Sequence, residues 1–217
     1  MRMVLRFVLK WLNKKKVAMD RQMLEFQRNA LLGKISAEPL CAQYKSKWRS
    51  CGDSKEMLVR LVMQQQSIPY FSHACYMNLG LTKEYIKENF GDFINGNKTL
   101  NDVEGVEGYK YQLYVDYSGD FKAVADVTSL MWCNCPTVSV EATKCPLFYV
   151  SNNSEVHFVL DGYNSIRIYL FDESKVVIDD ADETCDIVIY KYNNKSDVEL
   201  GKYCFGKVKI FNKTLRL

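Results

Sequence analysis

The chain has 217 residues, enough to bury a sizeable core as one large or two smaller domains. Its net charge is only +3, but residues 1–60 carry 14 lysines and arginines against 5 acidic residues, and residues 61–217 carry 15 against 21. The eight cysteines are too few for a disulfide scaffold and include no C-x-x-C pair of the kind that binds zinc. We therefore expect reduced, mostly buried cysteines, no metal and no cofactor.

The first residues predict a basic amphipathic helix. Residues 1–12, MRMVLRFVLKWL, are apolar apart from three basic residues spaced by four, and Lys14, Lys15 and Lys16 follow. This segment is too short to span a bilayer and lacks a small-residue cleavage site, so we predict neither a transmembrane segment nor a signal peptide. We assign residues 1–34 to a helical extension that packs on another subunit or on its own domain, in preference to lying on an anionic membrane surface.

Residues 35–100 predict a module of short helices. A preceding helix over residues 20–32 has a broad apolar stripe and ends at a glycine. Pro39 in the first turn opens a helix with Trp48 in its apolar face, and Pro69 interrupts or restarts a later one. Thr82 has the character of an N-cap, with Tyr85, Ile86 and Phe90 on one side of the helix that follows.

The C-terminal half contains a motif of apolar, any, apolar residue that returns every 9 to 11 positions. Period-two alternation puts the two apolar side chains of each triplet on one face of a strand. The eight copies are VSV at 138–140, LFY at 147–149, VHF at 156–158, IRI at 166–168, VVI at 176–178, IVI at 187–189, VEL at 198–200 and VKI at 208–210. Turn-forming residues separate the triplets, so eight short strands are predicted.

Two architectures fit this spacing. In a β-solenoid, two or three strands make one coil and the coils stack in parallel; in an antiparallel sandwich or meander, each strand pairs with its sequence neighbour. The near-constant spacing favours the solenoid, whereas Asp161-Gly162 and Asn193-Asn194 are hairpin-type dipeptides. We predict an α+β chain whose β-repeat domain, residues 101–217, is solenoid-like, with the antiparallel sandwich as the alternative.

The irregular start of the repeat predicts two further strands. Residues 109–115 alternate, and Phe121, Ala123, Ala125 and Val127 form the next alternating set. Terminal repeats are commonly atypical because one face must be capped, so these strands are interpreted as the first layers of the repeat.

The sequence contains no recognisable catalytic motif. Cys75 and His157 are a candidate nucleophilic pair, but neither residue lies in a nucleophile motif. We predict that the protein is not an enzyme. Binding of a glycan on exposed aromatic rings is an open alternative. The rings considered are Tyr163, Tyr169, Tyr190, Tyr192, Tyr203 and Phe211.

Several segments together resemble a family of uncharacterised proteins encoded by phages and prophages of gut Bacteroidota. They are Trp48, SKEML at 54–58, QSIPY at 66–70, LTKEYI at 81–86, FING at 93–96 and the β repeat. The resemblance spans about residues 35–217 and does not clearly cover the basic N-terminal residues. It implies a phage or mobile-element setting and transfers no functional residue.

From these observations we expect a structural or interaction protein of the virion-associated decoration or stalk type, in the virion or the host cytoplasm. The first alternative is an intracellular host-takeover or anti-defence protein that binds a host component. The second is a nucleic-acid-binding module, because basic residues surround Trp48. Its candidate contacts, which also serve as candidate partner contacts, are Lys14, Lys15, Lys16, Lys45, Lys47 and Arg49.

The end of the chain predicts self-association. The last strand, residues 208–212, would have an unpaired edge unless another segment covers it, and apolar residues follow it. Phe211, Leu215 and Leu217 are the candidate oligomer contacts, and a dimer or trimer is the expected assembly. The alternative is that the last residues fold back as a cap on their own solenoid.

Overall fold

The computed structural model describes residues 21–32, 42–50, 57, 61–62, 68–91, 94–95, 100–101, 110–140, 146–162 and 165–213. The predicted N-terminal helix, Lys14, Lys15, Lys16, Tyr163, Leu215 and Leu217 therefore lie outside the described residues. The helices are α2 (Arg21–Leu31), α3 (Ala42–Ser50), α5 (Ile68–Tyr76) and α6 (Lys83–Asn89).

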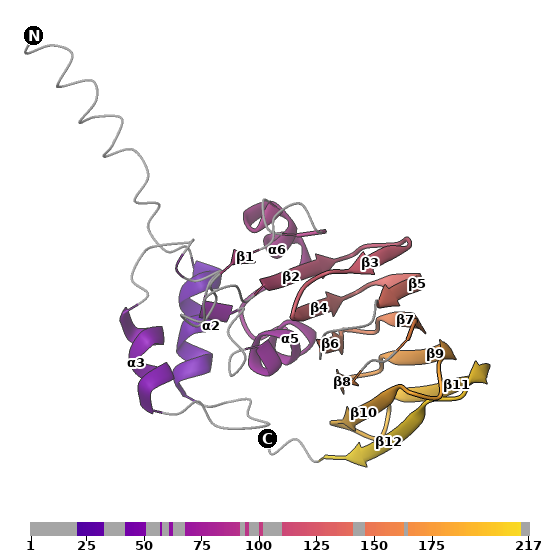
Figure 1. Cartoon of the computed structure of the whole chain (residues 1–217). Coiled ribbons are helices and arrows are strands. Elements are labelled where there is room, and N and C mark those ends of the chain that lie inside the picture. The colour runs from indigo at the N-terminus through magenta and orange to yellow at the C-terminus, as the bar shows by residue number, and fades with distance from the viewer. Residues whose placement is uncertain are drawn as a thin grey trace, which may run out of the picture.

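The strands form two sheets that face each other across a parallel β-solenoid of about five coils (Figure 1). The seven-stranded sheet has the order β1-β2-β4-β6-β8-β10-β12, and the five-stranded sheet has the order β11-β9-β7-β5-β3. The bounds are β1 (Leu100–Asn101), β2 (Lys110–Val115), β3 (Phe121–Ala123), β4 (Val127–Met131), β5 (Asn134–Val140), β6 (Leu147–Ser151), β7 (Glu155–Leu160), β8 (Ser165–Leu170), β9 (Lys175–Ala181), β10 (Asp186–Lys191), β11 (Asp197–Cys204) and β12 (Lys207–Asn212). The predicted α+β chain with a solenoid is confirmed.

The register explains the ten-residue repeat. Each coil takes about 20 residues, and successive triplets lie alternately in the two sheets, so Ile187 pairs in parallel with Ile166 and Val208 rather than with its sequence neighbours. Only β1 is antiparallel to its neighbour, β2, among the described strand pairs. The antiparallel sandwich is therefore excluded. The hairpin-type residues lie at coil corners instead, where Gly162 has a φ of 67°.

The first apolar residues of most triplets fill the space between the sheets, as the period-two alternation requires. The triplet at 147–149 departs from the prediction, because its middle residue Phe148 lies in this interior while Leu147 and Tyr149 face the helices. Val156, Val176, Ile166 and Ile187 are fully buried in this interior core. The residues on the other face of each strand point outward. Outward residues of β7 and β9 include Glu155, His157 and Lys175, which are only partly buried.

One row of corners is held by stacked polar residues. After β6 and β8, Asn152 and Asp172 adopt left-handed conformations with φ of 60° and 58°, which Asn and Asp tolerate better than most residues. Ser174 Oγ accepts a hydrogen bond from the Ser154 backbone N–H at 3.1 Å, and Ser154 Oγ accepts one from Cys133 N–H at 3.0 Å. At these corners the serine hydroxyls, rather than backbone carbonyls, accept the hydrogen bonds of the Cys133 and Ser154 N–H groups. They therefore connect each corner to the corner of the next coil.

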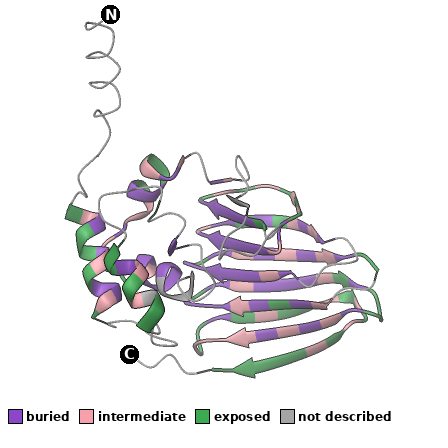
Figure 2. Ribbon diagram, turned by 60° about the vertical axis from the view of Figure 1, so that its left-hand side comes forward, coloured by how far each residue is buried: buried purple, intermediate pink, exposed green. Residues whose placement is uncertain are grey.

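The helices cover the outer face of the first strands. Outward residues of β2, β4 and β6 join a second core with the helices, here called the helix-side core. Figure 2 shows the change along the stack, from buried strands beside the helices to the exposed last strand. Residues of this core are Met23, Phe26, Trp48, Phe71, Ile86, Phe90, Tyr111, Leu113, Val115, Val127, Met131, Tyr149 and Phe171 among others.

The described helices match the local sequence signals. Thr82 caps α6 as predicted, because its Oγ1 accepts a hydrogen bond from the Tyr85 N–H at 3.1 Å. Pro69 lies in the first turn of α5 and so restarts a helix, where its missing N–H costs nothing. The apolar stripe of the helix predicted over residues 20–32 is narrower than expected, because Leu24 of α2 is exposed.

The irregular start of the repeat differs from the prediction in one respect. Phe121 to Val127 is not one alternating strand, because β3 ends at Ala123 and a bend follows at Ala125 and Asp126. Val127 instead begins β4, which pairs with both β2 and β6. This bend is the corner of a coil that is shorter than the later ones. The apolar alternation continues through the corner, so the sequence carries no sign that the strand ends there.

Candidate functional site: the open end of the solenoid

The open end is formed by the last three strands, β10, β11 and β12, which contain the triplets IVI, VEL and VKI. Their apolar first and third residues point into the interior, in the same register as the coils above. Gly206 supports the final corner, where an added Cβ would lie 3.1 Å from the Cys185 Cβ and 3.2 Å from the Ala181 Cβ. The local fold is therefore regular up to the end of β12.

Among the described residues, none covers the interior core at this end. Ile168, Ile189 and Ile210 form one register column, and the first two are fully buried, whereas Ile210 is 45% exposed. In the opposite sheet Leu200 pairs with the fully buried Ile178 and is itself 54% exposed. The side chains have equivalent positions, so their exposure arises because no described coil lies beyond them.

The strand edges are open at the same place. Among the described residues, β12 pairs only with β10, and β11 pairs only with β9. Lys207 N–H donates to Cys185 O and Lys213 N–H donates to Lys191 O, so by alternation the N–H groups of Val208, Ile210 and Asn212 point away from β10. Such an edge is a template for pairing with another strand.

Aromatic side chains form a column on the outer face of the seven-stranded sheet. The ring centroids of Tyr149 and Tyr169 lie 4.7 Å apart, those of Tyr169 and Tyr190 5.1 Å, and those of Tyr190 and Phe211 5.6 Å, with interplanar angles of 10° to 25°. Stacked rings cover one another's faces, so this column offers mainly ring edges to a sugar. Phe211 is the last ring, and it is 46% exposed.

Charges differ between the two edge strands. The outward side of β12 carries Lys207 and Lys209, and Lys213 follows it with its Nζ 5.4 Å from the centre of the Tyr190 ring. On β11, Asp197 and Glu199 point outward. Glu199 accepts a hydrogen bond from Lys175 Nζ at 3.0 Å, and this bond raises the pKa of Lys175. Lys202 also lies on β11, and Lys209 Nζ lies 3.7 Å from Asp186 Oδ1. The β12 edge is therefore basic, and the β11 edge is acidic at its start.

Of the predicted oligomer contacts, the structure describes only Phe211, and it places this residue at the open end. Sequence reasoning missed the two residues that mark the end most clearly, Leu200 and Ile210. Both belong to the triplet repeat, which predicted them as buried interior residues.

A second cluster joins the helices to the solenoid. His73 of α5 donates from Nδ1 to Asp172 Oδ1 at 2.6 Å, and Asp172 Oδ2 accepts from the Asn152 N–H at 3.1 Å. The Asn152 side-chain amide donates to Ser72 O at 2.9 Å. Both ring and carboxylate are buried. This network is a structural joint between α5 and the coil corners, although Asn152 Oδ1 and Ser72 Oγ are buried without a hydrogen-bond partner among the described residues.

The structure does not bring Cys75 and His157 together. Cys75 lies in the helix-side core, where burial raises the pKa of its thiol, and the Asp172 carboxylate raises it further. His157 points outward from β7 in the other sheet, with its Nδ1 2.9 Å from Asp179 Oδ2. The considered nucleophilic pair is therefore not formed.

The basic residues of α3 do not surround an exposed ring. Trp48 is fully buried and packs edge-on against Phe26, with ring centroids 5.3 Å apart. Arg49 is exposed, and Lys45 and Lys47 are half-buried. A base cannot stack on Trp48 in this arrangement, so any contact of α3 with nucleic acid would be through phosphates.

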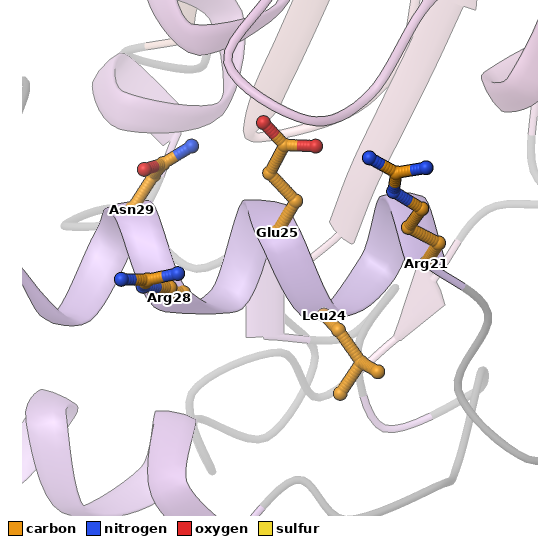
Figure 3. A pocket seen from close by; sticks show the side chains of 5 residues that line it. All are labelled: Arg21, Leu24, Glu25, Arg28 and Asn29. Carbon is orange, nitrogen blue, oxygen red and sulfur yellow. The ribbon is translucent and has the colours of Figure 1, made fainter.

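A hollow of about 440 Å³ lies beside α2 (Figure 3). Its described lining is Arg21, Leu24, Glu25, Arg28 and Asn29. Asn29 is buried, and its side-chain amide donates to Leu79 O at 3.2 Å. Glu25 lies between the two arginines along the helix, so the lining has no uniform charge that would define an anion site.

The described residues include no candidate membrane-spanning helix and no candidate metal site. None of the described helices combines the length and the apolar character needed to cross a membrane. In the same part of the chain, no three His, Cys, Asp or Glu side chains gather as a set of metal ligands. Comparison of the chain with protein-family models, curated proteins and solved structures found no match.

Proposed function

We propose that this chain is a non-enzymatic structural or interaction protein, in which the solenoid is a rigid spacer and its open end is the contact surface. The observation that carries the proposal is the exposure of Leu200 and Ile210, interior residues whose counterparts one coil earlier are fully buried. A soluble chain gains free energy by covering such residues, at about 25 cal/mol per Å² of apolar surface.

The rest of the chain is suited to holding this end in place. Parallel coils with a continuous interior core make a stiff element, because each coil contacts its neighbours along two strands. The helix-side core and the joint between His73 and Asp172 attach α5 to the same element. A stalk or decoration protein of a phage particle would need these properties, and the phage setting rests on the resemblance of segments 35–217 alone.

The test is quantitative mass spectrometry of purified phage particles and of the cytosol of infected cells. The expected result is a fixed molar ratio of this protein to the major capsid protein in the particles. Recovery in the cytosol alone would contradict the virion assignment.

The contact surface is tested by repeating the measurement with phage that encode Leu200→Asp, which puts a carboxylate into the open end. We expect the variant to accumulate in cells at the normal level and to be depleted from particles. Met77→Asp is the control, because Met77 is exposed to a similar extent but lies after α5. Equal incorporation of both variants would move the contact away from this end.

A further inference from the structure

The two ends of the solenoid are not equivalent. At the N-terminal end the seven-stranded sheet is closed by β1, which is two residues long and antiparallel, and α6 contacts β2 there. At the C-terminal end, β11 and β12 present full strand edges and uncovered interior side chains. A head-to-tail stack would therefore join unlike surfaces, whereas two C-terminal ends offer the same surface to each other.

Because the proposed function makes this end a protein contact, we propose that its partner is a second copy of the chain, joined end to end about a two-fold axis parallel to the strands. Closed two-fold contacts are the commonest in soluble homo-oligomers, and each uses the same surface twice. This arrangement continues both sheets by adding one strand edge to another.

The direction of the strands fixes which edges meet. The chain runs out along one sheet and back along the other, so β11 and β12 run in opposite directions (Figure 1). Rotation about an axis parallel to the strands places β12 of one copy beside β11 of the other, and these strands are antiparallel. Rotation about an axis perpendicular to the sheets would instead pair β12 with β12 and β11 with β11.

Charge distinguishes these two arrangements. Pairing β12 with itself would bring Lys207, Lys209 and Lys213 of both copies into one row, and pairing β11 with itself would bring Asp197 and Glu199 together. Pairing β12 with β11 instead sets the lysines of β12 beside a strand that begins with Asp197 and Glu199. Opposite charges across neighbouring strands are stabilising and like charges are destabilising, so the axis parallel to the strands is favoured.

The same rotation predicts a particular neighbour. It leaves each residue at its own position along the strand direction. β12 ends level with the end of β10, since Asn212 pairs with Lys191, and β11 begins just after that corner. Lys213 of one copy therefore lies level with Asp197 of the other. The interior residues Leu200 and Ile210 of both copies meet between the sheets.

The first test is the mass of the full-length chain in solution, measured by light scattering over a broad concentration range. We expect twice the chain mass of 25.2 kDa, and a monomer for Leu200→Asp and Ile210→Asp. Each substitution buries an unpaired carboxylate in the contact, so Kd should rise by a factor of about 100 or more. Met77→Asp should remain a dimer. Circular dichroism and thermal melting of the variants show whether they remain folded.

The second test uses two exposed residues, Asp197 and Lys213. Asp197→Cys and Lys213→Cys chains are mixed under mild oxidation, and disulfide-linked peptides are identified by mass spectrometry. We expect a link between positions 197 and 213 in the mixture, and no link of 197 to 197 or 213 to 213 in either variant alone. A 213-to-213 link would overturn the choice of axis.

A wild-type monomer at every concentration would overturn the inference of a second copy. It would leave the proposed contact surface standing, because incorporation of Leu200→Asp into particles is measured separately. A dimer that persists in both aspartate variants would overturn the inference as well, since it would place the interface elsewhere.

Discussion

Asp172 is the residue on which the joint between helices and solenoid depends. Its two carboxylate oxygens accept from His73 and from the Asn152 backbone, and its own backbone is left-handed at φ 58°. One side chain therefore satisfies a ring and a peptide N–H that are both buried.

We predict that Asp172→Ala lowers the free energy of unfolding by about 3 kcal/mol, because it leaves buried donors unpaired and puts alanine in a left-handed conformation. Asp172→Asn should cost about 1 kcal/mol, since an amide oxygen still accepts and Asn tolerates the backbone. Urea unfolding of the three proteins measures both differences. Equal losses for the two variants would show that the hydrogen bonds are not the cause.

Glycine is required at position 201 because two strands approach closely there. An added Cβ would lie 2.6 Å from the Asp179 carbonyl oxygen, at the register shift between Leu200 and Tyr203. We predict a loss of about 1–3 kcal/mol for Gly201→Ala in urea unfolding. Gly91→Ala is the matched control, because nothing lies within 4 Å of its added Cβ; its effect should stay within about 0.5 kcal/mol. Similar costs at both positions would contradict the close approach.

At the scale of single elements, the strands were the most predictable part of the chain. Each of the eight triplets lies in a strand, because interior packing between two sheets imposes period-two alternation on every coil. The partner of each strand was harder to predict, since a spacing of ten residues is compatible both with half a solenoid coil and with a hairpin. The sequence did not predict β4 as a strand separate from β3. Both faces of β4 are buried, so its residues Thr128, Ser129 and Leu130 do not alternate between buried and exposed.

The sequence analysis did not predict that the helices pack on the outer face of the early strands, although the sequence carries a signal for this contact. Outward positions of the early strands are apolar, as at Leu113, Val127 and Tyr149, whereas later outward positions hold Arg167 and Lys209. A strand that is apolar on both faces needs cover on both. The joint at His73 and Asp172 could not be predicted, because its members are 99 residues apart and no motif connects them.

α6 is attached to the solenoid through Asp116. Hydrogen bonds from Lys87 and Lys83 hold the pKa of this carboxyl below its ordinary value. A lowered folded-state pKa stabilises the fold above the unfolded value, near pH 3.9, and this stabilisation is lost as pH falls through the folded value. Because all three side chains are about a third or more exposed, the contribution is small.

We therefore predict that Asp116→Asn, which tolerates the same left-handed backbone, lowers the free energy of unfolding by about 0.5 kcal/mol near pH 7. The difference from wild type should shrink below pH 4 and also in high salt. Urea unfolding at several pH values measures it. A difference that stays constant from pH 7 down to pH 2 would show that the carboxylate charge plays no part.

At the scale of the whole molecule, the chain is asymmetric along its solenoid. One end is closed by β1 and the helices, and the other exposes interior residues, open edges and the last ring of the aromatic column. Sequence reasoning identified the last strand as an edge, because the triplets stop there. It could not show that Leu200, ten residues earlier, belongs to the same surface, since this requires knowing that the coil has two strands.

The central claim is that the edge of β12 pairs with another strand, and amide hydrogen exchange followed by NMR tests it most directly. The N–H groups of Val208, Ile210 and Asn212 point away from β10, whereas those of Lys207 and Lys213 are bonded to it. At high protein concentration we expect the outward N–H groups of Val208, Ile210 and Asn212 to be protected as well, because in an antiparallel pair every residue that faces the partner strand bonds it. On dilution these outward N–H groups should exchange faster by a factor of about 10 or more. Exchange at Val208, Ile210 and Asn212 that is fast at every concentration would contradict the pairing of β12 with a strand of a second copy.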